Sequence, residues 1–546
     1  MVVPELRPWR AAGPHVVRAA NAVRPRLARA ARAAKPQLER VANAARPRLE
    51  QAVAAARPQL ARVLSARPKT SGTWQYTAGA ATAGVALAVT VAAAAGPWDS
   101  TGQRTAEVER AVARDRTGGA DHGPRADTSD KAGSPRPAPS APSVLVGLGG
   151  STNAVKSAPT GPALADVLGP LLGVPALGTQ HTAVVVDVAT GRRLYGTGAD
   201  DPLTPASTTK IATAVAALSA LGAEHRLTTR TVLEADTKEV VLVGGGDPTL
   251  TAHQESDGWA SLRDLADRTA AALKKRSVHE VTLSYDTTLY TGPALHPIGV
   301  NDNLAPVSAL MADEGRTDDS SSGPAPRVAD PAADAATRFA RFLAADGIKT
   351  TSPGPSRGTT RAQALASVSS PPLSALVERM LTNSDNDIAE ALARQTALAT
   401  GAPAGFAGGA SAIAAQLKKL QLPVQGARFT DGSGLNRDDR LTADLLTALL
   451  VKAGAPAHPE LRPVLTGLPV AGFTGTLTSR YTDGAAGVVR AKTGTLTGVN
   501  TLAGTVVDQD GRLLAFAFLA SQTSNPMSAQ AALDRTATAL AACGCR

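Results

Sequence analysis

Cysteine is nearly absent from this chain of 546 residues, which contains only Cys543 and Cys545. The two lie one residue apart at the C-terminal end of the sequence. This distribution excludes a disulfide framework, a cysteine-based zinc cluster and a catalytic thiol served by a distant partner. It leaves the redox compartment of the protein open.

Aromatic residues are also scarce, at 3% of the sequence, whereas alanine, glycine, proline and arginine are abundant, as is typical of a GC-rich genome. The net charge of +10 comes from basic residues concentrated before residue 70, and the remainder is close to balanced. This pattern does not indicate a nucleic-acid-binding domain, and we expect no nucleic-acid partner.

Residues 1–70 contain a basic repeat whose prolines, Pro25, Pro36, Pro47 and Pro58, recur every 11 residues. Proline at this spacing blocks a continuous helix and favours short amphipathic turns. Two interpretations stay open: the segment binds the anionic cytoplasmic surface of a membrane, or it is a solvated, disordered arm.

Residues 71–98 contain no charged side chain, and Trp74 and Trp98 bracket this stretch at a helical separation of about 36 Å. Length and flanking aromatics predict one transmembrane helix; a buried soluble helix and a removed signal peptide are the alternatives. Because the positive charge precedes the span, residues 1–70 are expected in the cytoplasm and everything after it outside the cell. The prediction is a single-pass cell-membrane protein with an extracellular catalytic domain.

Residues 99–178 are rich in Gly, Pro, Ala and Ser and predict a flexible linker. A folded domain is expected from residue 179 to residue 546. Apolar runs predict strands at 183–188, 194–195, 487–491, 499–507 and 513–520, and helices at 207–221 and 528–542. Strands from both ends of the domain with helices between them indicate an α+β fold whose antiparallel sheet is completed by non-local pairing.

Ser207 and Lys210 form the only Ser-x-x-Lys of the chain, at the start of a predicted helix. Residues three apart share a helix face, so the Lys210 amine can reach the Ser207 hydroxyl. The N-terminus of the helix also favours negative charge developing on the serine oxygen. The pattern alone is weak, because a Ser and a Lys recur at this spacing by chance.

Two further motifs follow in order. Ser384-Asp385-Asn386 supplies a Ser-x-Asn, and a Lys-Thr-Gly at 492–494, followed by Thr495, occurs once, on a predicted strand. A second Ser-x-Asn, at 151–153, lies in the predicted linker and shows that this triplet occurs readily by chance. Because all three motifs lie in one order on suitable elements, coincidence is a poor explanation.

With these motifs the chain resembles the penicillin-recognising serine enzymes, specifically the D-alanyl-D-alanine carboxypeptidase/endopeptidase family of low-molecular-weight penicillin-binding proteins. The resemblance spans about residues 180–540 and includes Asp-Gly-Ser-Gly-Leu at 431–435 and Gly-Thr-Leu-Thr-Gly-Val at 494–499. It implies a β-lactamase-like transpeptidase fold interrupted by an accessory insertion at about 225–370. It also implies peptidoglycan stem peptides as substrates and β-lactams as inhibitors, with no cofactor and no metal.

The resemblance further implies acyl transfer through Ser207 as the nucleophile. Lys210 is the leading candidate for the base, Asn386 holds Lys210, and Ser384 relays a proton to the leaving amine with the help of Lys492.

Thr493, Gly494 and Thr495 are expected to bind the substrate, with the terminal carboxylate near the two threonine hydroxyls. The alternatives are a β-lactamase, which needs a separate group to activate water, and a non-catalytic β-lactam sensor or wall-binding protein. Residues 1–70 contain no recognisable output domain for a sensor.

Overall fold

The computed structural model describes residues 159–481 and 484–545. The basic repeat at 1–70, the membrane span at 71–98 and most of the linker at 99–178 lie outside the described residues. Within the described ranges, no helix combines the length and the apolar character that crossing a membrane requires.

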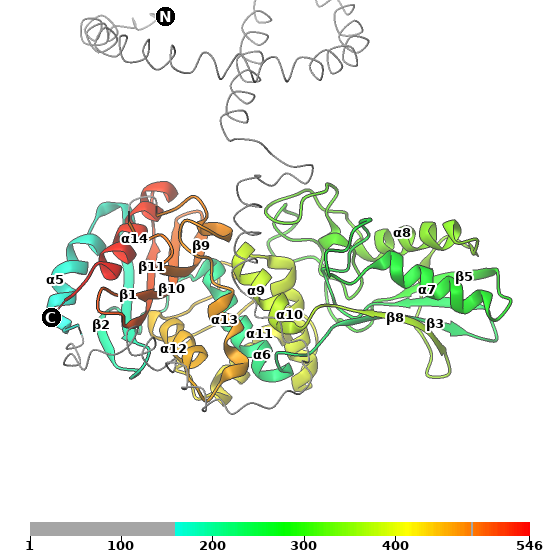
Figure 1. Cartoon of the computed structure of the whole chain (residues 1–546), viewed down its shortest axis with the longest axis horizontal. Coiled ribbons are helices and arrows are strands. Elements are labelled where there is room, and N and C mark those ends of the chain that lie inside the picture. Colours follow the sequence, from blue (N-terminus) through cyan, green and yellow to red (C-terminus); the bar gives the residue numbers. More distant parts are fainter. Residues whose placement is uncertain (1–158, 482–483, 546) are drawn as a thin grey trace, which may run out of the picture. The chain divides into compact units, whose positions relative to one another are not determined.

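A five-stranded antiparallel sheet forms the centre of the catalytic region (Figure 1). Its strands, in spatial order, are β2 (Arg193–Thr197), β1 (Gln180–Asp187), β11 (Leu513–Ser521), β10 (Val499–Val507) and β9 (Val489–Leu496). The N-terminal hairpin therefore pairs with the C-terminal strands through β1 and β11, as the sequence predicted.

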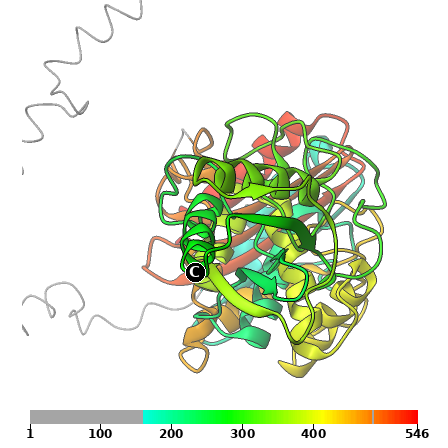
Figure 2. The same cartoon turned by 90° about the vertical axis from the view of Figure 1, so that its right-hand side faces the viewer.

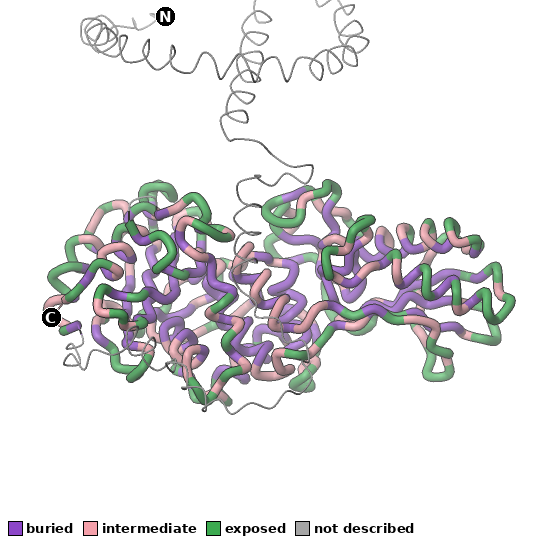
Figure 3. Tube along the Cα trace, viewed as in Figure 1, coloured by how far each residue is buried: buried purple, intermediate pink, exposed green. Residues whose placement is uncertain are grey.

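Helices cover both faces of this sheet, so alternate residues of one strand enter different cores. Ala183 and Val185 of β1 pack with α5 (Gly161–Leu172) and α14 (Pro526–Ala541), whereas Val184 and Val186 face the other helical layer. Buried residues concentrate between these layers (Figure 3).

Helix α5 corrects the predicted boundary between linker and domain. Leu164, Leu168 and Leu172 recur every four residues and are buried against the sheet and α14. The backbone N–H of Thr160 also donates to the carbonyl of Cys545, next to the disulfide that joins Cys543 and Cys545. Residues 161–177 therefore belong to the folded domain, and the start predicted at residue 179 is wrong.

The second helical layer carries most of the chemistry. Its central helix, α6 (Thr209–Leu221), follows a 3-10 turn, η2 (Ala206–Thr208), and is buried along its first three turns. Around it lie α9 (Leu373–Asn383), α10 (Asn386–Thr400), α11 (Phe406–Lys419), α12 (Ala443–Gly454) and α13 (Pro463–Thr466).

The chain between α6 and α9 forms an inserted region with a second sheet, which Figure 2 shows from its own side. The sheet has the order β6-β5-β4-β3-β8, with β7 paired to β5, and α7 and α8 pack on one face. The bounds are β3 (Thr228–Glu234), β4 (Glu239–Val243), α7 (Leu262–Lys274), β5 (Glu280–Asp286), α8 (Pro331–Ala345), β6 (Lys349–Thr350), β7 (Gly354–Pro355) and β8 (Gln363–Ser369).

Between β5 and α8, residues 287–330 form a long segment whose regular structure is limited to one 3-10 turn, Asp313–Gly315. We call it the returning segment, because it contacts residues of the catalytic region rather than extending the second sheet.

Candidate active site

Ser207 lies in the turn η2, between a tightly packed strand and a tightly packed loop. The preceding residue, Ala206, has a positive φ of 49°, which is uncommon for a residue with a side chain. A Cβ at Gly434 would lie 1.9 Å from the Ala206 carbonyl oxygen, and one at Gly494 would lie 2.7 Å from the Pro205 carbonyl oxygen. Glycine at both positions lets the loop and β9 approach the serine turn closely.

Lys210 lies one helical turn after Ser207 and is completely buried. Its Nζ donates to Ser207 Oγ at 3.0 Å, to Asn386 Oδ1 at 2.6 Å and to the Ser433 carbonyl at 2.7 Å. These acceptors saturate the ammonium group and direct the amine at the serine hydroxyl.

Burial makes the ammonium form of Lys210 less favourable than that of an exposed lysine. Burial lowers the pKa of Lys210 to about 8, against the opposing effect of Asp431, Asp385 and nearby carboxylates. A lysine of this kind can exchange a proton near neutral pH, which an exposed lysine cannot do.

The Ser384–Asn386 motif forms the junction between α9 and α10. Ser384 ends α9 in the left-handed region, and Asp385 caps α10 by accepting from the N–H of Ile388 at 2.9 Å. Asn386 accepts from Lys210 and donates through Nδ2 to the Asn303 carbonyl at 2.9 Å. In the described residues, no hydrogen bond joins the Ser384 hydroxyl to Ser207 or to Lys492.

The Lys-Thr-Gly motif lies on the edge strand β9. Lys492 is fully buried, and its pKa is well below the usual value because of burial and then the charges of Lys210 and Arg480. Its Nζ donates to the Thr493 carbonyl at 2.9 Å. Thr493 and Thr495 line the cleft.

One cleft of about 420 Å³ brings the three motifs together. Ser207, Ser384, Asn386, Thr493 and Thr495 line it, whereas Lys210 and Lys492 lie buried beneath them. The structure therefore assembles all the predicted site residues in one place, with Gly494 as the close-packing position of β9.

The sequence did not single out the residues that the returning segment brings to this cleft, among them Asn303, Arg316 and Arg327. Arg327 pairs with Asp387 at 2.9 Å, and Arg316 pairs with Glu314 at 2.8 Å. Isolated arginines in a loop carry no spacing signal, so only the fold reveals them.

The Asp431–Gly434 loop also belongs to the site, because its Ser433 carbonyl accepts from Lys210. In the sequence the Asp-Gly-Ser-Gly stretch contributed only to the family resemblance, and such a stretch does not show which backbone carbonyl faces a lysine.

Two clusters in the described residues place possible metal-ligand atoms within 4.8 Å of one another. In the first, His296 is hydrogen-bonded to Asp431, and Glu390 accepts two backbone N–H groups. In the second, arginines pair with the carboxylates of Glu314 and Asp387. Hydrogen bonds and ion pairs account for both clusters, and we assign no metal to them.

The arrangement is suited to acyl transfer by a serine. A hydroxyl at a helix N-terminus contacts a buried amine with a lowered pKa, and Thr493 and Thr495 of β9 line the same cleft.

Comparisons with known proteins agree with this chemistry. The model of the D-Ala-D-Ala carboxypeptidase 3 (S13) family matches residues 164–326 and 319–540. Carboxypeptidase DacB of Mycolicibacterium smegmatis is 39% identical over 406 residues, which cover 71% of this chain and 85% of that protein. A D-alanyl-D-alanine carboxypeptidase of Actinomadura is 29% identical over 455 residues, covering 67% of this chain and 84% of that protein.

Among solved structures, penicillin-binding protein 4 of Haemophilus influenzae superposes with a TM-score of 0.56 at 21% identity, covering 68% of this chain and 97% of that one. This likeness confirms the α+β fold with an inserted region. A second structure of the same Haemophilus protein holds a β-lactam.

Proposed function

The chain belongs to the S13 family of serine D-Ala-D-Ala carboxypeptidases, which act on peptidoglycan, and we propose that it cleaves its substrate through an acyl-enzyme on Ser207. The observation that carries the proposal is the buried Lys210 amine, which lies 3.0 Å from Ser207 Oγ and whose pKa is about 8.

In the acylation step, Ser207 Oγ attacks the carbonyl carbon between the two D-alanines while its proton moves to Lys210 Nζ. A neutral lysine is required, because only an unprotonated amine can accept a proton. The hydrogen bonds to Asn386 and to the Ser433 carbonyl hold the amine in place during the transfer.

The negative charge that develops on the carbonyl oxygen needs donors that are already in position. We assign this role to the backbone N–H groups of Ser207 and Thr495, each worth about 3 kcal/mol in such sites. The close packing of Gly494 on the serine turn keeps the two elements together.

Departure of D-alanine requires a proton on its nitrogen. In our proposal Ser384, on the cleft wall, relays to this nitrogen the proton that Lys210 Nζ took from Ser207 Oγ, with the help of the buried amine of Lys492. Thr493 and Thr495 bind the terminal carboxylate, and water then releases the acyl group from Ser207.

β-Lactams carry an amide that mimics the scissile bond, so we propose that they acylate Ser207 as well. Cleavage of cross-linked stem peptides is a further proposal, because a cross-link is also an amide on the carbonyl of a D-alanine.

We also propose that the protein is anchored by residues 71–98, with its catalytic domain outside the cell. This proposal rests on the uncharged stretch and on the basic segment before it. Protease added to intact protoplasts should remove the catalytic domain. A catalytic domain that resists the protease would contradict the proposed orientation.

The activity is tested by incubating the protein with a muropeptide that ends in D-Ala-D-Ala and following free D-alanine. We expect release by the unmodified protein and none by Ser207→Ala. Parallel incubation with a cross-linked dimer separates carboxypeptidase from endopeptidase action. Release of D-alanine by Ser207→Ala would contradict the assignment of the nucleophile.

A further inference from the structure

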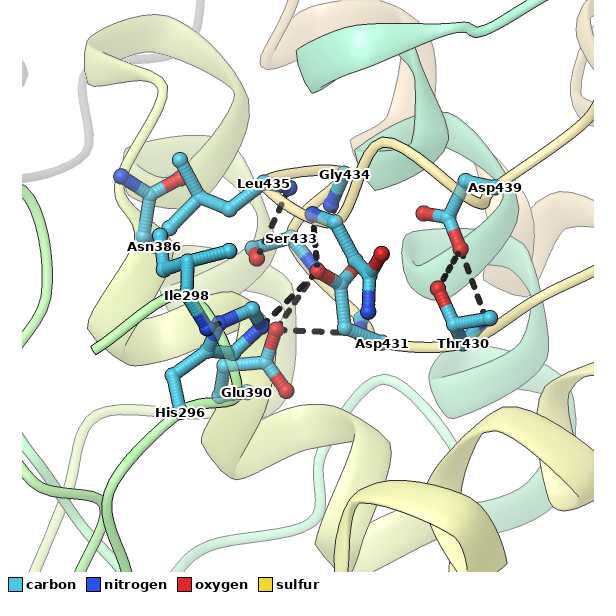
Figure 4. Close-up of polar contacts among 12 residues, drawn as sticks. His296, Ile298, Asn386, Glu390, Thr430, Asp431, Ser433, Gly434, Leu435 and Asp439 are labelled. Carbon is cyan, nitrogen blue, oxygen red and sulfur yellow. Dashed lines mark hydrogen bonds and ion pairs between the residues drawn. The ribbon is translucent and has the colours of Figure 1, made fainter.

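The returning segment of the inserted region brings His296 to Asp431, which lies in the loop that contacts the catalytic lysine. The side chain of His296 is 1% exposed, and its Nε2 lies 3.0 Å from Asp431 Oδ2, whose own side chain is 0% exposed (Figure 4). The backbone N–H of Ile298 donates to His296 Nδ1 at 3.2 Å. Nδ1 is therefore the acceptor nitrogen, and the proton on Nε2 is donated to Asp431.

Asp431 in turn shapes the loop that holds Lys210. One carboxylate oxygen accepts from the N–H of Gly434 at 2.6 Å, and the other accepts from the N–H of Asn436 at 2.7 Å. Ser433 directly precedes the first of these anchor points, so its carbonyl, which receives the Lys210 amine at 2.7 Å, belongs to the same peptide unit as the Gly434 N–H.

Glu390, which is also buried, holds the same loop from α10. Its Oε1 accepts from the N–H groups of Gly432 and Ser433 at 3.1 and 2.9 Å. A carboxylate on each side thus fixes the direction of the Ser433 carbonyl, and His296 fixes one of the two carboxylates. The ring of Phe406 packs edge-on against the imidazole at 5.0 Å, which leaves His296 little freedom to rotate.

We propose that His296 is a positioning residue for catalysis: through Asp431 it sets the Ser433 carbonyl that aims the Lys210 amine at Ser207. The inserted region then contributes to acylation through His296, in addition to forming a wall of the cleft. This inference rests on the proposed roles of Ser207 and Lys210.

The electrostatics support the same role. The carboxylates of Asp431, Asp385, Glu390 and Asp387 lie near Lys210 and raise its pKa against the effect of burial. The other buried lysine of the site, Lys492 of β9, also lies near it. Of these carboxylates, Asp431 raises the pKa of Lys210 the most.

The neutral imidazole of His296 donates to Asp431 and stabilises the negative charge of this carboxylate locally. The carboxylate then attracts the Lys210 proton less strongly. Although burial alone would raise the pKa of Asp431, its interactions with His296, with the neighbouring carboxyl of Asp439 and with the loop backbone keep it below the usual value. Removing the imidazole should therefore shift the rising limb of the acylation rate to higher pH.

The test compares His296→Leu with His296→Gln, since a glutamine amide can still donate to Asp431. We would measure the rate constant for acylation by a fluorescent penicillin from about pH 6 to about pH 9, and kcat and KM for a D-Ala-D-Ala peptide. His296→Leu should lower the acylation rate and kcat about 10- to 100-fold, with a smaller change in KM, as misplacement of a catalytic group does. His296→Gln should recover most of the rate.

His253→Leu is the matched control, because His253 lies in the same inserted region and faces Asp313 at 3.5 Å without contacting the Lys210 network. Titration of penicillin-binding sites per molecule separates folding from rate. A His296→Leu protein that acylates at the rate of the control would overturn the proposal. The proposal would also be overturned if the His296→Leu protein had fewer penicillin-binding sites per molecule, but each site acylated at the normal rate and with an unchanged pH profile. Labelling that survives Ser207→Ala would instead refute the proposed nucleophile.

Discussion

Raising the pH should accelerate the acylation of the protein by a penicillin, because Lys210 must lose its proton before it can accept the one on Ser207. With a pKa of about 8, roughly one molecule in ten carries a neutral amine at about pH 7. A lysine at its usual pKa of about 10.4 would be neutral in only about one molecule in 2,500. Burial thus makes the competent form about 250 times more abundant.

The expected profile follows from these proportions. Below about pH 7 the acylation rate constant should rise close to tenfold per pH unit, and above about pH 8 it should level off. Stopped-flow measurement of acylation by a chromogenic β-lactam, from about pH 6 to about pH 9, follows this rise of the rate constant with pH directly. Salt should move it little, since the groups around Lys210 are buried.

Lys210→Met keeps the length of the side chain and removes the base. Acylation should fall by about 10² to 10⁴-fold, as loss of a general base does, and the limb near pH 8 should disappear. Lys492→Met should weaken binding of the peptide carboxylate and slow the release of D-alanine, with a milder effect on acylation by penicillin. A Lys210→Met protein with the normal rate and the normal limb would refute the role of Lys210; equal, mild losses in both variants would refute the division of labour.

Other expected outcomes concern the packing around the site. Leu168→Ala in α5 should lower the free energy of unfolding by about 2–5 kcal/mol in urea titration, because Leu168 is fully buried; a change near zero would mean that α5 does not belong to the folded domain. Gly434→Ala should abolish most acylation in the penicillin assay, because its Cβ would lie 1.9 Å from the Ala206 carbonyl oxygen at a φ of +79°. A normal rate in that variant would show that the loop does not support the serine turn.

Much of the catalytic region could be predicted from local patterns. Apolar runs located the strands of the first sheet, although the run at 487–491 covers only the start of β9. The spacing of Ser207 and Lys210 placed both groups on one helix face. The order of the motifs then indicated a single site, and residues of all three motifs line one cleft.

Other features escaped the sequence for physical reasons. The three buried leucines of α5 lie among glycines and prolines, so the composition of a linker concealed a helix that begins after Thr160 and contains Pro170. His296 and Asn303 reach the site only through the path of the returning segment, which has no periodicity to read. Their partners, Asp431 and Asn386, are 135 and 83 residues away along the chain.

The most direct test of the central claim is to locate the covalent bond. The protein is treated with benzylpenicillin, its intact mass is measured, and the modified peptide is sequenced by tandem mass spectrometry. We expect one penicilloyl group per molecule, on Ser207, and none on Ser207→Ala. A group attached to Ser384, or to any residue other than Ser207, would contradict the account of the site.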